Sequence, residues 1–159
     1  MRFKVLLGLA AMAATIGCAP TVDLTRALRV EAVATGWFDA GVVEGKTKIV
    51  PAVSITLKNG SDQTLSTLQV NAVFRRVDQS TEWSSGFLTA VGSDGLAPAA
   101  STGLLLLRAD RGYTGTDPQW ALLQNSQFVD ATVDLFAKYG SSKWARLGEY
   151  PIRRVLIER

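Results

Sequence analysis

The sequence contains no histidine and only one cysteine, Cys18. Without histidine, the chain cannot build a Ser-His-Asp or Cys-His catalytic site, or a metal site with imidazole ligands. Without a second cysteine, it cannot form an internal disulfide. The P-loop, the dinucleotide-binding glycine pattern and the Ser-x-x-Lys motif are also absent. We therefore expect no catalytic residue, no cofactor and no metal site, and we predict that the protein is not an enzyme.

Paired carboxylates are the one catalytic arrangement that the composition leaves open, because glycosidases need only two acids at a suitable separation. Asp130 and Asp134 are predicted to project from one face of a single strand, which separates them by roughly 13 Å. That distance exceeds the separations that glycosidases use. We therefore interpret both residues as solvated edge charges, with a carboxylate-based hydrolase as a remote alternative.

Positive charge is not concentrated anywhere in the sequence. The chain has 17 basic and 14 acidic residues, and the loss of Arg2 and Lys4 with a predicted signal segment leaves 15 and 14. Arginine doublets occur at 75–76 and 153–154. Nucleic-acid binding requires a basic patch, so we expect no nucleic-acid partner and interpret the doublets as solvated positions.

The most hydrophobic segment is too short to span a membrane as a helix. It runs for twelve residues, from Val5 to Ile16, whereas a spanning helix needs roughly 20. Charged residues precede this segment and small residues follow it. This order is typical of a secretory signal peptide, and we predict a cleaved signal over residues 1–17.

The end of that segment, "TIGC" at 15–18, resembles the bacterial lipobox, although Thr15 stands where the pattern prefers leucine. The resemblance implies cleavage before Cys18, acylation of its thiol and anchoring in a membrane facing the periplasm or the cell surface. Ala19 replaces the aspartate that favours inner-membrane retention in enterobacterial lipoproteins, which favours the outer membrane. The alternative is an ordinary signal peptide that leaves an unpaired thiol open to oxidation.

Alternation of apolar and polar residues predicts about seven short strands in a single domain over residues 27–159, after a linker over 18–26. The residues predicted to face the core are Leu28, Val30, Ala32 and Ala34; Val53, Ile55 and Leu57; Leu68, Val70, Ala72 and Phe74; and Val129, Ala131, Val133 and Leu135. Further strands are expected over 82–91 and 149–158. A near-continuous apolar run at 101–110 is typical of a central strand. Turn residues occupy 59–62.

One short helix is predicted within 116–125. Asp117 can cap it and Pro118 fits its first position. Trp120, Leu122 and Leu123 are then expected to face the core. Many strands with one small helix favour an all-β fold, specifically a single antiparallel immunoglobulin-like sandwich.

The segment from 48 to 108 resembles the FxLYD type of bacterial immunoglobulin-like domain and the late-embryogenesis-abundant-like sandwich. The residues that carry the resemblance are Asn59, Ser61, Leu65, Val70, Phe74, Leu96 and Pro98. Arg75 and Arg76 depart from the Tyr-Asp that usually follows the phenylalanine, and Ala99 departs from the usual glycine. The resemblance implies an extracytoplasmic interaction domain.

Large aromatic side chains are the best candidates for binding, because they anchor many interfaces. The candidates for contact with a partner are Trp83, Tyr113, Trp120 and Phe136. Loop 113–120 carries two of them. The alternative is that the tryptophans, including Trp37 and Trp144, close the ends of the sandwich.

These features predict a membrane-anchored, non-catalytic lipoprotein that acts as an interaction or assembly module of the cell envelope. Its expected partners are the membrane, through the anchor, and another envelope protein. The main alternative is a carrier of lipid or glycan, which requires a sizeable apolar cavity.

The lipid anchor is tested by substituting Cys18→Ala. Because stable anchoring depends on the acyl chains, we expect the protein to move from the membrane to the soluble fraction on cell fractionation. An unchanged distribution would contradict the anchor.

Overall fold

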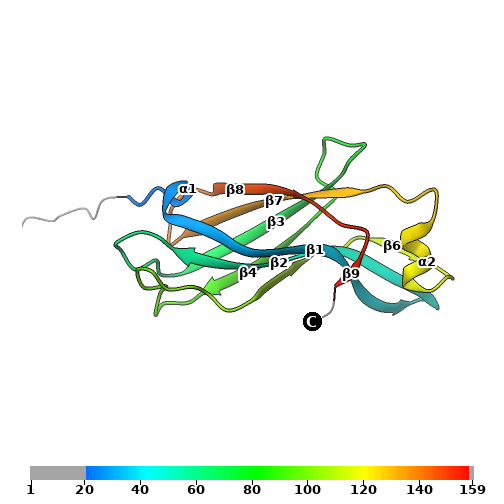
Figure 1. Cartoon of the computed structure of the whole chain (residues 1–159), viewed down its shortest axis with the longest axis horizontal. Coiled ribbons are helices and arrows are strands. Elements are labelled where there is room, and N and C mark those ends of the chain that lie inside the picture. Colours follow the sequence, from blue (N-terminus) through cyan, green and yellow to red (C-terminus); the bar gives the residue numbers. More distant parts are fainter. Residues whose placement is uncertain (1–20, 158–159) are drawn as a thin grey trace, which may run out of the picture.

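The computed structural model describes residues 21–157, in which two β-sheets dominate (Figure 1). The predicted signal peptide and Cys18 lie outside these residues. The described elements are α1 (Leu24–Ala27), β1 (Leu28–Val43), β2 (Lys46–Asn59), β3 (Leu68–Arg76), β4 (Ser84–Val91), β5 (Leu105–Arg108), β6 (Tyr113–Gly115), α2 (Gln119–Gln124), β7 (Ala131–Tyr139), β8 (Ala145–Pro151) and β9 (Leu156–Ile157). The long axis of the molecule runs from α1 at one end to α2 at the other.

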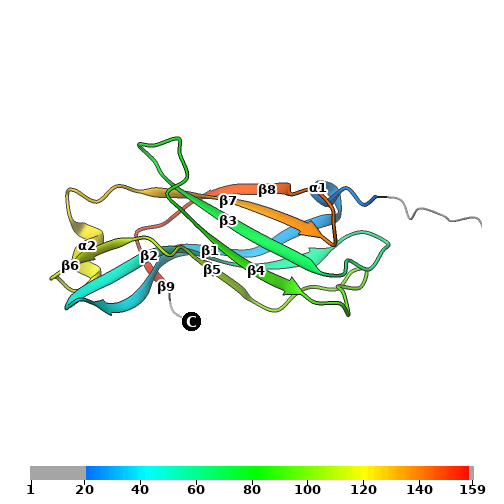
Figure 2. The same ribbon diagram turned by 180° about the vertical axis from the view of Figure 1, so that it is seen from behind.

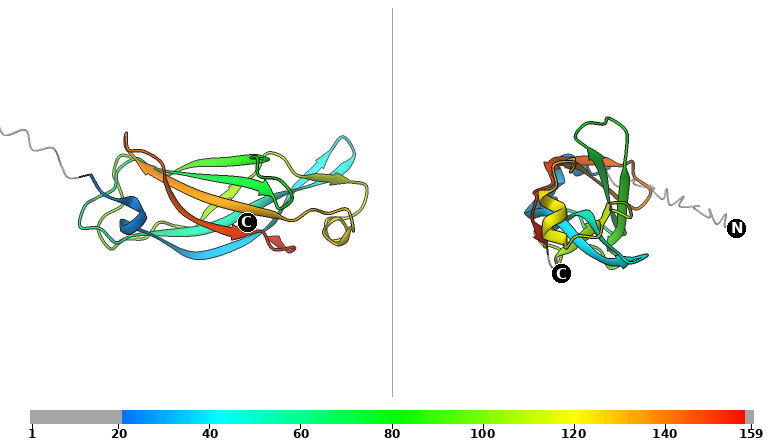
Figure 3. Two further views of the ribbon diagram at one scale, coloured as in Figure 1. Left: turned by 90° about the horizontal axis from the view of Figure 1, so that it is seen from above. Right: turned by 90° about the vertical axis from the view of Figure 1, so that its right-hand side faces the viewer.

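One sheet has five strands in the order β5-β2-β1-β9, with β6 also paired to β2, and the other has four in the order β4-β3-β7-β8 (Figure 2). Figure 3 shows the arrangement of the strands from above and from one end. Buried residues of both sheets form one hydrophobic core. The prediction of an all-β sandwich is confirmed. The described residues contain nine strands rather than about seven, and the β1–β9 pair is parallel.

Alternation predicts the core face correctly on the strands that lie inside the sheets. The predicted inward residues of β2 and β3, from Val53 to Leu57 and from Leu68 to Phe74, are completely buried. On β7, Ala131, Val133 and Leu135 are buried as predicted, whereas Val129 precedes the strand and is half-buried. These strands are flanked on both sides, so their side-chain period of two is undisturbed.

Strand β1 departs from its predicted pattern because a bulge interrupts it. Its register with β2 shifts between Glu31 and Ala34, and Ala32 has a positive φ of 50°. A bulge adds a residue to one strand and moves the following side chains to the other face. Ala32 and Ala34 are therefore exposed, contrary to prediction, and Thr35 is buried.

The apolar run at 101–110 forms the edge strand β5 rather than a central strand. Strand β4 of the other sheet lies close to β5. A Cβ on Gly86 would come within 2.5 Å of the Arg108 carbonyl oxygen. This contact between the sheets explains how a strand rich in leucine can lie at an edge.

The predicted C-terminal strand is divided between the two sheets as β8 and β9. Pro151 is the last residue of β8, an edge strand, where a residue without an N–H group is accommodated. The Thr35 hydroxyl binds the segment that passes from β8 in one sheet to β9 in the other. It donates to the Pro151 carbonyl oxygen at 2.8 Å and accepts from the Arg153 N–H at 3.3 Å.

The two helices also differ from the predictions. Helix α1 lies partly within the predicted linker, and Leu24 is buried in the core. Asp23 caps this helix, and its carboxylate accepts hydrogen bonds from the hydroxyl and the N–H of Thr25. These bonds, above all the one from the hydroxyl, lower the pKa of Asp23. Pro118 occupies the N-cap of α2, without a capping bond from a side chain, and Trp120 points outward.

Asn59, at the end of β2, makes side-chain hydrogen bonds to the two loops that contain Gln63 and Leu96. Its buried side-chain amide donates to the carbonyl oxygens of Gln63 at 2.7 Å and Leu96 at 2.8 Å. Its side-chain oxygen accepts from the N–H and the hydroxyl of Ser61. The turn predicted at 59–62 is therefore present, with its first residue inside the protein.

We expect Asn59→Ala to lower the free energy of unfolding by about 2 kcal/mol or more, because it removes four hydrogen bonds of a buried side chain, each worth about 0.5–1.5 kcal/mol. Urea denaturation measures this change. Asn71→Ala, on the outer face of β3, is the control and should change stability by less than about 0.5 kcal/mol. Equal effects of the two substitutions would contradict the role of Asn59.

Candidate functional site

Two of the predicted binding aromatics, Trp83 and Tyr113, belong to an inward cluster. They pack with Trp37, which is completely buried, and with Phe128; ring centroids lie 4.6–6.4 Å apart. The Tyr113 hydroxyl donates to the Val129 carbonyl oxygen at 3.0 Å. Both side chains are half-buried and packed against the core at the α2 end, so a binding role for Trp83 and Tyr113 stays a prediction.

The two aspartates considered as a catalytic pair are engaged separately. Asp130 precedes β7 and accepts hydrogen bonds from Arg154, the shorter being 2.6 Å. Asp134 lies on β7, between β3 and β8, so it is not at a sheet edge. It is buried beneath Arg75 and Arg146, and both guanidinium groups bond to its carboxylate. The two acids face different arginines.

Arg146 connects Asp134 to Glu149 on the outer face of the four-stranded sheet. Its Nε donates to Asp134 at 2.8 Å, and its Nη2 donates to Glu149 at 2.6 Å. The hydrogen bond to Asp134, reinforced by the opposite charge, raises the pKa of Arg146 above its ordinary value. This cluster balances its own charge and fixes β7 to β8.

An exposed groove with a partly apolar lining lies between α2 and the segment that leads into β9. We call it the α2–β9 groove; it is lined by Trp120, Leu123, Gln124, Arg154, Val155 and Leu156 and has a volume of about 600 Å³. Trp120 is 60% exposed, Leu156 43% and Val155 38%. A second hollow of about 350 Å³, lined in part by Val33, Ala34 and Tyr150, adjoins it through Val155.

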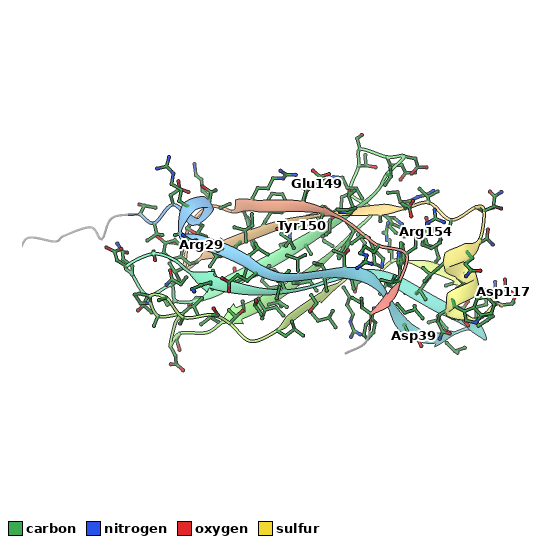
Figure 4. All side chains as sticks on the ribbon, in the orientation of Figure 1. Arg29, Asp39, Asp117, Glu149, Tyr150 and Arg154 are labelled. Atoms are coloured by element: carbon green, nitrogen blue, oxygen red, sulfur yellow. The ribbon has the colours of Figure 1, made fainter. Side chains whose placement is uncertain are left out.

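Polar contacts hold both walls of the α2–β9 groove in place. The guanidinium of Arg154 lies over the Phe128 ring, 4.9 Å from its centroid, and donates to the carbonyl oxygens of Leu123 and Phe128. The hydrogen bond to Asp130 is the main cause that raises the pKa of Arg154. At the start of α2, the Gln119 side chain donates to Asp39, which is labelled in Figure 4, at 2.7 Å. The groove is therefore formed before any partner arrives.

Gly36 allows the β9 segment to lie against β1. A Cβ at this position would be 2.7 Å from the Val155 carbonyl oxygen and 2.6 Å from Cγ2 of Ile157. The Trp37 N–H donates to the same Val155 oxygen at 2.8 Å. The chain crosses so close to β1 that a larger residue would displace one wall of the groove.

A second exposed aromatic surface lies on the outer face of the four-stranded sheet. Phe87 is 58% exposed and Trp144 43%, and their rings meet edge to face with centroids 6.3 Å apart. The Lys138 ammonium lies 5.1 Å from the centre of the Trp144 ring. Phe136 is half-buried in the same row of residues as Phe87, with Asn71 between them. We call Phe87, Phe136, Lys138 and Trp144 the aromatic face.

The structure thus assigns the four predicted binding residues to three places. Trp120 is in the α2–β9 groove, Phe136 is on the aromatic face, and Trp83 and Tyr113 are half-buried and packed against the core. Sequence reasoning missed Phe87, Val155 and Leu156. The polar position of Phe87 in the alternation of 82–91 was a usable signal, whereas exposure of Val155 and Leu156 depends on the crossing to β9.

Within residues 21–157, no helix is long and apolar enough to cross a membrane. The same residues contain no group of three or more acidic or cysteine side chains placed to hold a metal ion.

No protein-family profile and no curated protein matches the chain. A solved structure described as "X-ray structure of Northeast Structural Genomics Consortium target SoR45" is similar over 82% of this chain and 89% of that chain. The sequence identity is 14% and the TM-score is 0.46. A similarity of this size assigns neither a family nor a function.

The role of Gly36 is tested by Gly36→Ala. Overpacking of this kind costs about 1–3 kcal/mol, so we expect a loss of unfolding free energy in that range and faster hydrogen exchange at the Trp37 amide. Gly103→Ala is a matched control, because nothing lies within 4 Å of a Cβ there; it should change stability by less than about 0.5 kcal/mol. Unchanged exchange at Trp37 in Gly36→Ala would show that β9 does not depend on this contact.

Proposed function

We propose that the protein is a non-catalytic lipoprotein of the cell envelope that binds another envelope protein through the α2–β9 groove. The observation that carries the proposal is the clustering of Trp120, Val155 and Leu156 at one pre-formed hollow. Exposed apolar side chains gathered in a groove are typical of protein-interaction sites. Tryptophan is also among the residues that most often dominate binding energy.

Rigidity of the groove supports the same function. Binding is weakened by the entropy lost when loops and side chains become ordered, and a pre-formed site avoids most of that loss. Arg154 fixes one wall and the Gln119–Asp39 hydrogen bond fixes α2. An extended or helical apolar segment of a partner would therefore meet a surface that need not rearrange.

The position of the groove suits an anchored protein. The described chain enters at the α1 end, and α2 lies at the opposite end. We propose that acylation of Cys18 holds the α1 end near the membrane, so that the groove is presented away from the bilayer. The outer membrane is the proposed location.

A filled core favours an interaction module over a carrier. The space between the sheets is occupied by one cluster of buried side chains, including the large rings of Trp37 and Phe74, whereas the α2–β9 groove lies on the surface. A carrier would need an apolar cavity that encloses most of its ligand. The finer immunoglobulin-like and FxLYD-like assignment is likewise part of this proposal, supported by the two-sheet architecture.

The proposal is tested by photo-crosslinking in living cells with the full chain. A photoreactive amino acid in place of Leu156 should give a discrete adduct with one envelope protein. In that background, Trp120→Ala should reduce the adduct about tenfold or more, which corresponds to a loss of about 1.4 kcal/mol in binding.

Leu104 is the matched control position, because it is 67% exposed but lies outside the groove. The same photoreactive residue there should give no such adduct. Equal adducts from both positions, or an adduct that Trp120→Ala leaves unchanged, would contradict binding through the groove.

A further inference from the structure

We propose that the aromatic face is a membrane-contact surface, which rests against anionic phospholipid headgroups and orients the anchored domain. This inference rests on the anchoring part of the proposed function and concerns a different surface from the α2–β9 groove. It commits to a lipid surface as the occupant.

The chain path places the aromatic face beside the predicted anchor. The Val22 N–H donates to the Tyr139 hydroxyl at 2.9 Å. Tyr139 ends β7, and the turn that follows it leads directly to Trp144. Val22 is only four positions after Cys18, and four residue steps extend at most about 14 Å. An acylated Cys18 would therefore keep the bilayer within reach of this hairpin.

The chemistry of the aromatic face matches the boundary between headgroups and acyl chains. Tryptophan is enriched at that boundary because its ring is apolar and its N–H is polar. Phe87 adds a second exposed ring next to Trp144. The long stem of Lys138 runs along the same surface and brings its ammonium over the indole, an arrangement that lets the charge reach the headgroups.

The charges on this face favour an anionic surface. On the outer side of the four-stranded sheet, Asp134 and Glu149 are paired with Arg75 and Arg146, so these four groups balance. Lys138 has no carboxylate within salt-bridge distance among residues 21–157, and the exposed Lys143 immediately precedes Trp144. Two surplus cations therefore lie beside the exposed rings. Basic residues near an anionic membrane are attracted to it over about 10 Å at moderate salt.

A small surface is sufficient for membrane contact, because the lipid anchor already holds the domain at the membrane and the contact does not have to recruit the protein from solution. A few rings and two cations would bind vesicles weakly on their own, but a short tether holds them at a local concentration on the order of millimolar. The expected consequence is orientation. The α1 end of the four-stranded sheet faces the bilayer, and the α2–β9 groove lies at the opposite end of the molecule.

Tryptophan quenching tests the contact on the full lipidated chain reconstituted in phosphatidylglycerol–phosphatidylethanolamine vesicles. Phospholipids brominated on the acyl chains quench only indoles that reach the membrane. We expect quenching of the native protein to fall by about half or more in Trp144→Phe. Trp120→Phe is the matched control, since Trp120 is also exposed but lies in the groove, and it should leave the quenched amplitude unchanged.

Lys138→Gln and vesicles of phosphatidylcholine alone test the electrostatic part, and each should reduce quenching. Flotation of the same samples reports the anchor independently, so a chain that fails to float disproves anchoring rather than the contact. A chain that floats but shows equal quenching in the native protein and Trp144→Phe would overturn the membrane-contact surface. Retention on cell-wall polysaccharide that Trp144→Ala abolishes, without quenching by lipid, would assign the aromatic face to glycan instead and overturn the proposal.

Discussion

The antiparallel ladder between β1 and β2 is the constraint on which the rest of the structure depends. Its register runs from the Leu28–Asn59 pair at the α1 end to the Val43–Lys46 pair at the hairpin. β5 and β6 add to β2, β9 adds to β1, and buried side chains of β2 form much of the floor of the core. Both exposed surfaces are therefore positioned, directly or across the core, by this one ladder.

Stability and proposed function share residues at the α2 end. Arg154 binds Asp130 and two backbone carbonyl groups, and in doing so forms a wall of the α2–β9 groove. Gly36 permits the crossing that exposes Val155 and Leu156. A partner would thus bind a surface whose shape is set by the fold itself. The aromatic face belongs to the other sheet, which allows one domain to meet a membrane and a protein at once.

Local periodicity predicted those parts of the fold in which neighbours on both sides reinforce it. Val53 to Leu57 on β2 and Leu68 to Phe74 on β3 are buried as their alternation requires. The prediction failed where a distant contact decides the outcome. The bulge after Glu31 changes which residues of β1 face the core, and β9 pairs with β1 at Trp37 and Phe38 beyond the bulge. The edge strand β5, which is rich in leucine, approaches β4 closely at Gly86.

The sequence by itself determined the all-β character, the core faces of the inner strands, the absence of histidine and disulfide chemistry, and the charge of the chain, because composition and local period depend on no distant partner. Only the tertiary structure decided which aromatic residues are exposed. Trp83 and Trp120 cannot be distinguished by sequence, yet one packs against Trp37 and the other lines a groove. The exposure of each aromatic side chain depends on which segments of the chain are in contact with it, and those contacts join residues that are far apart in the sequence.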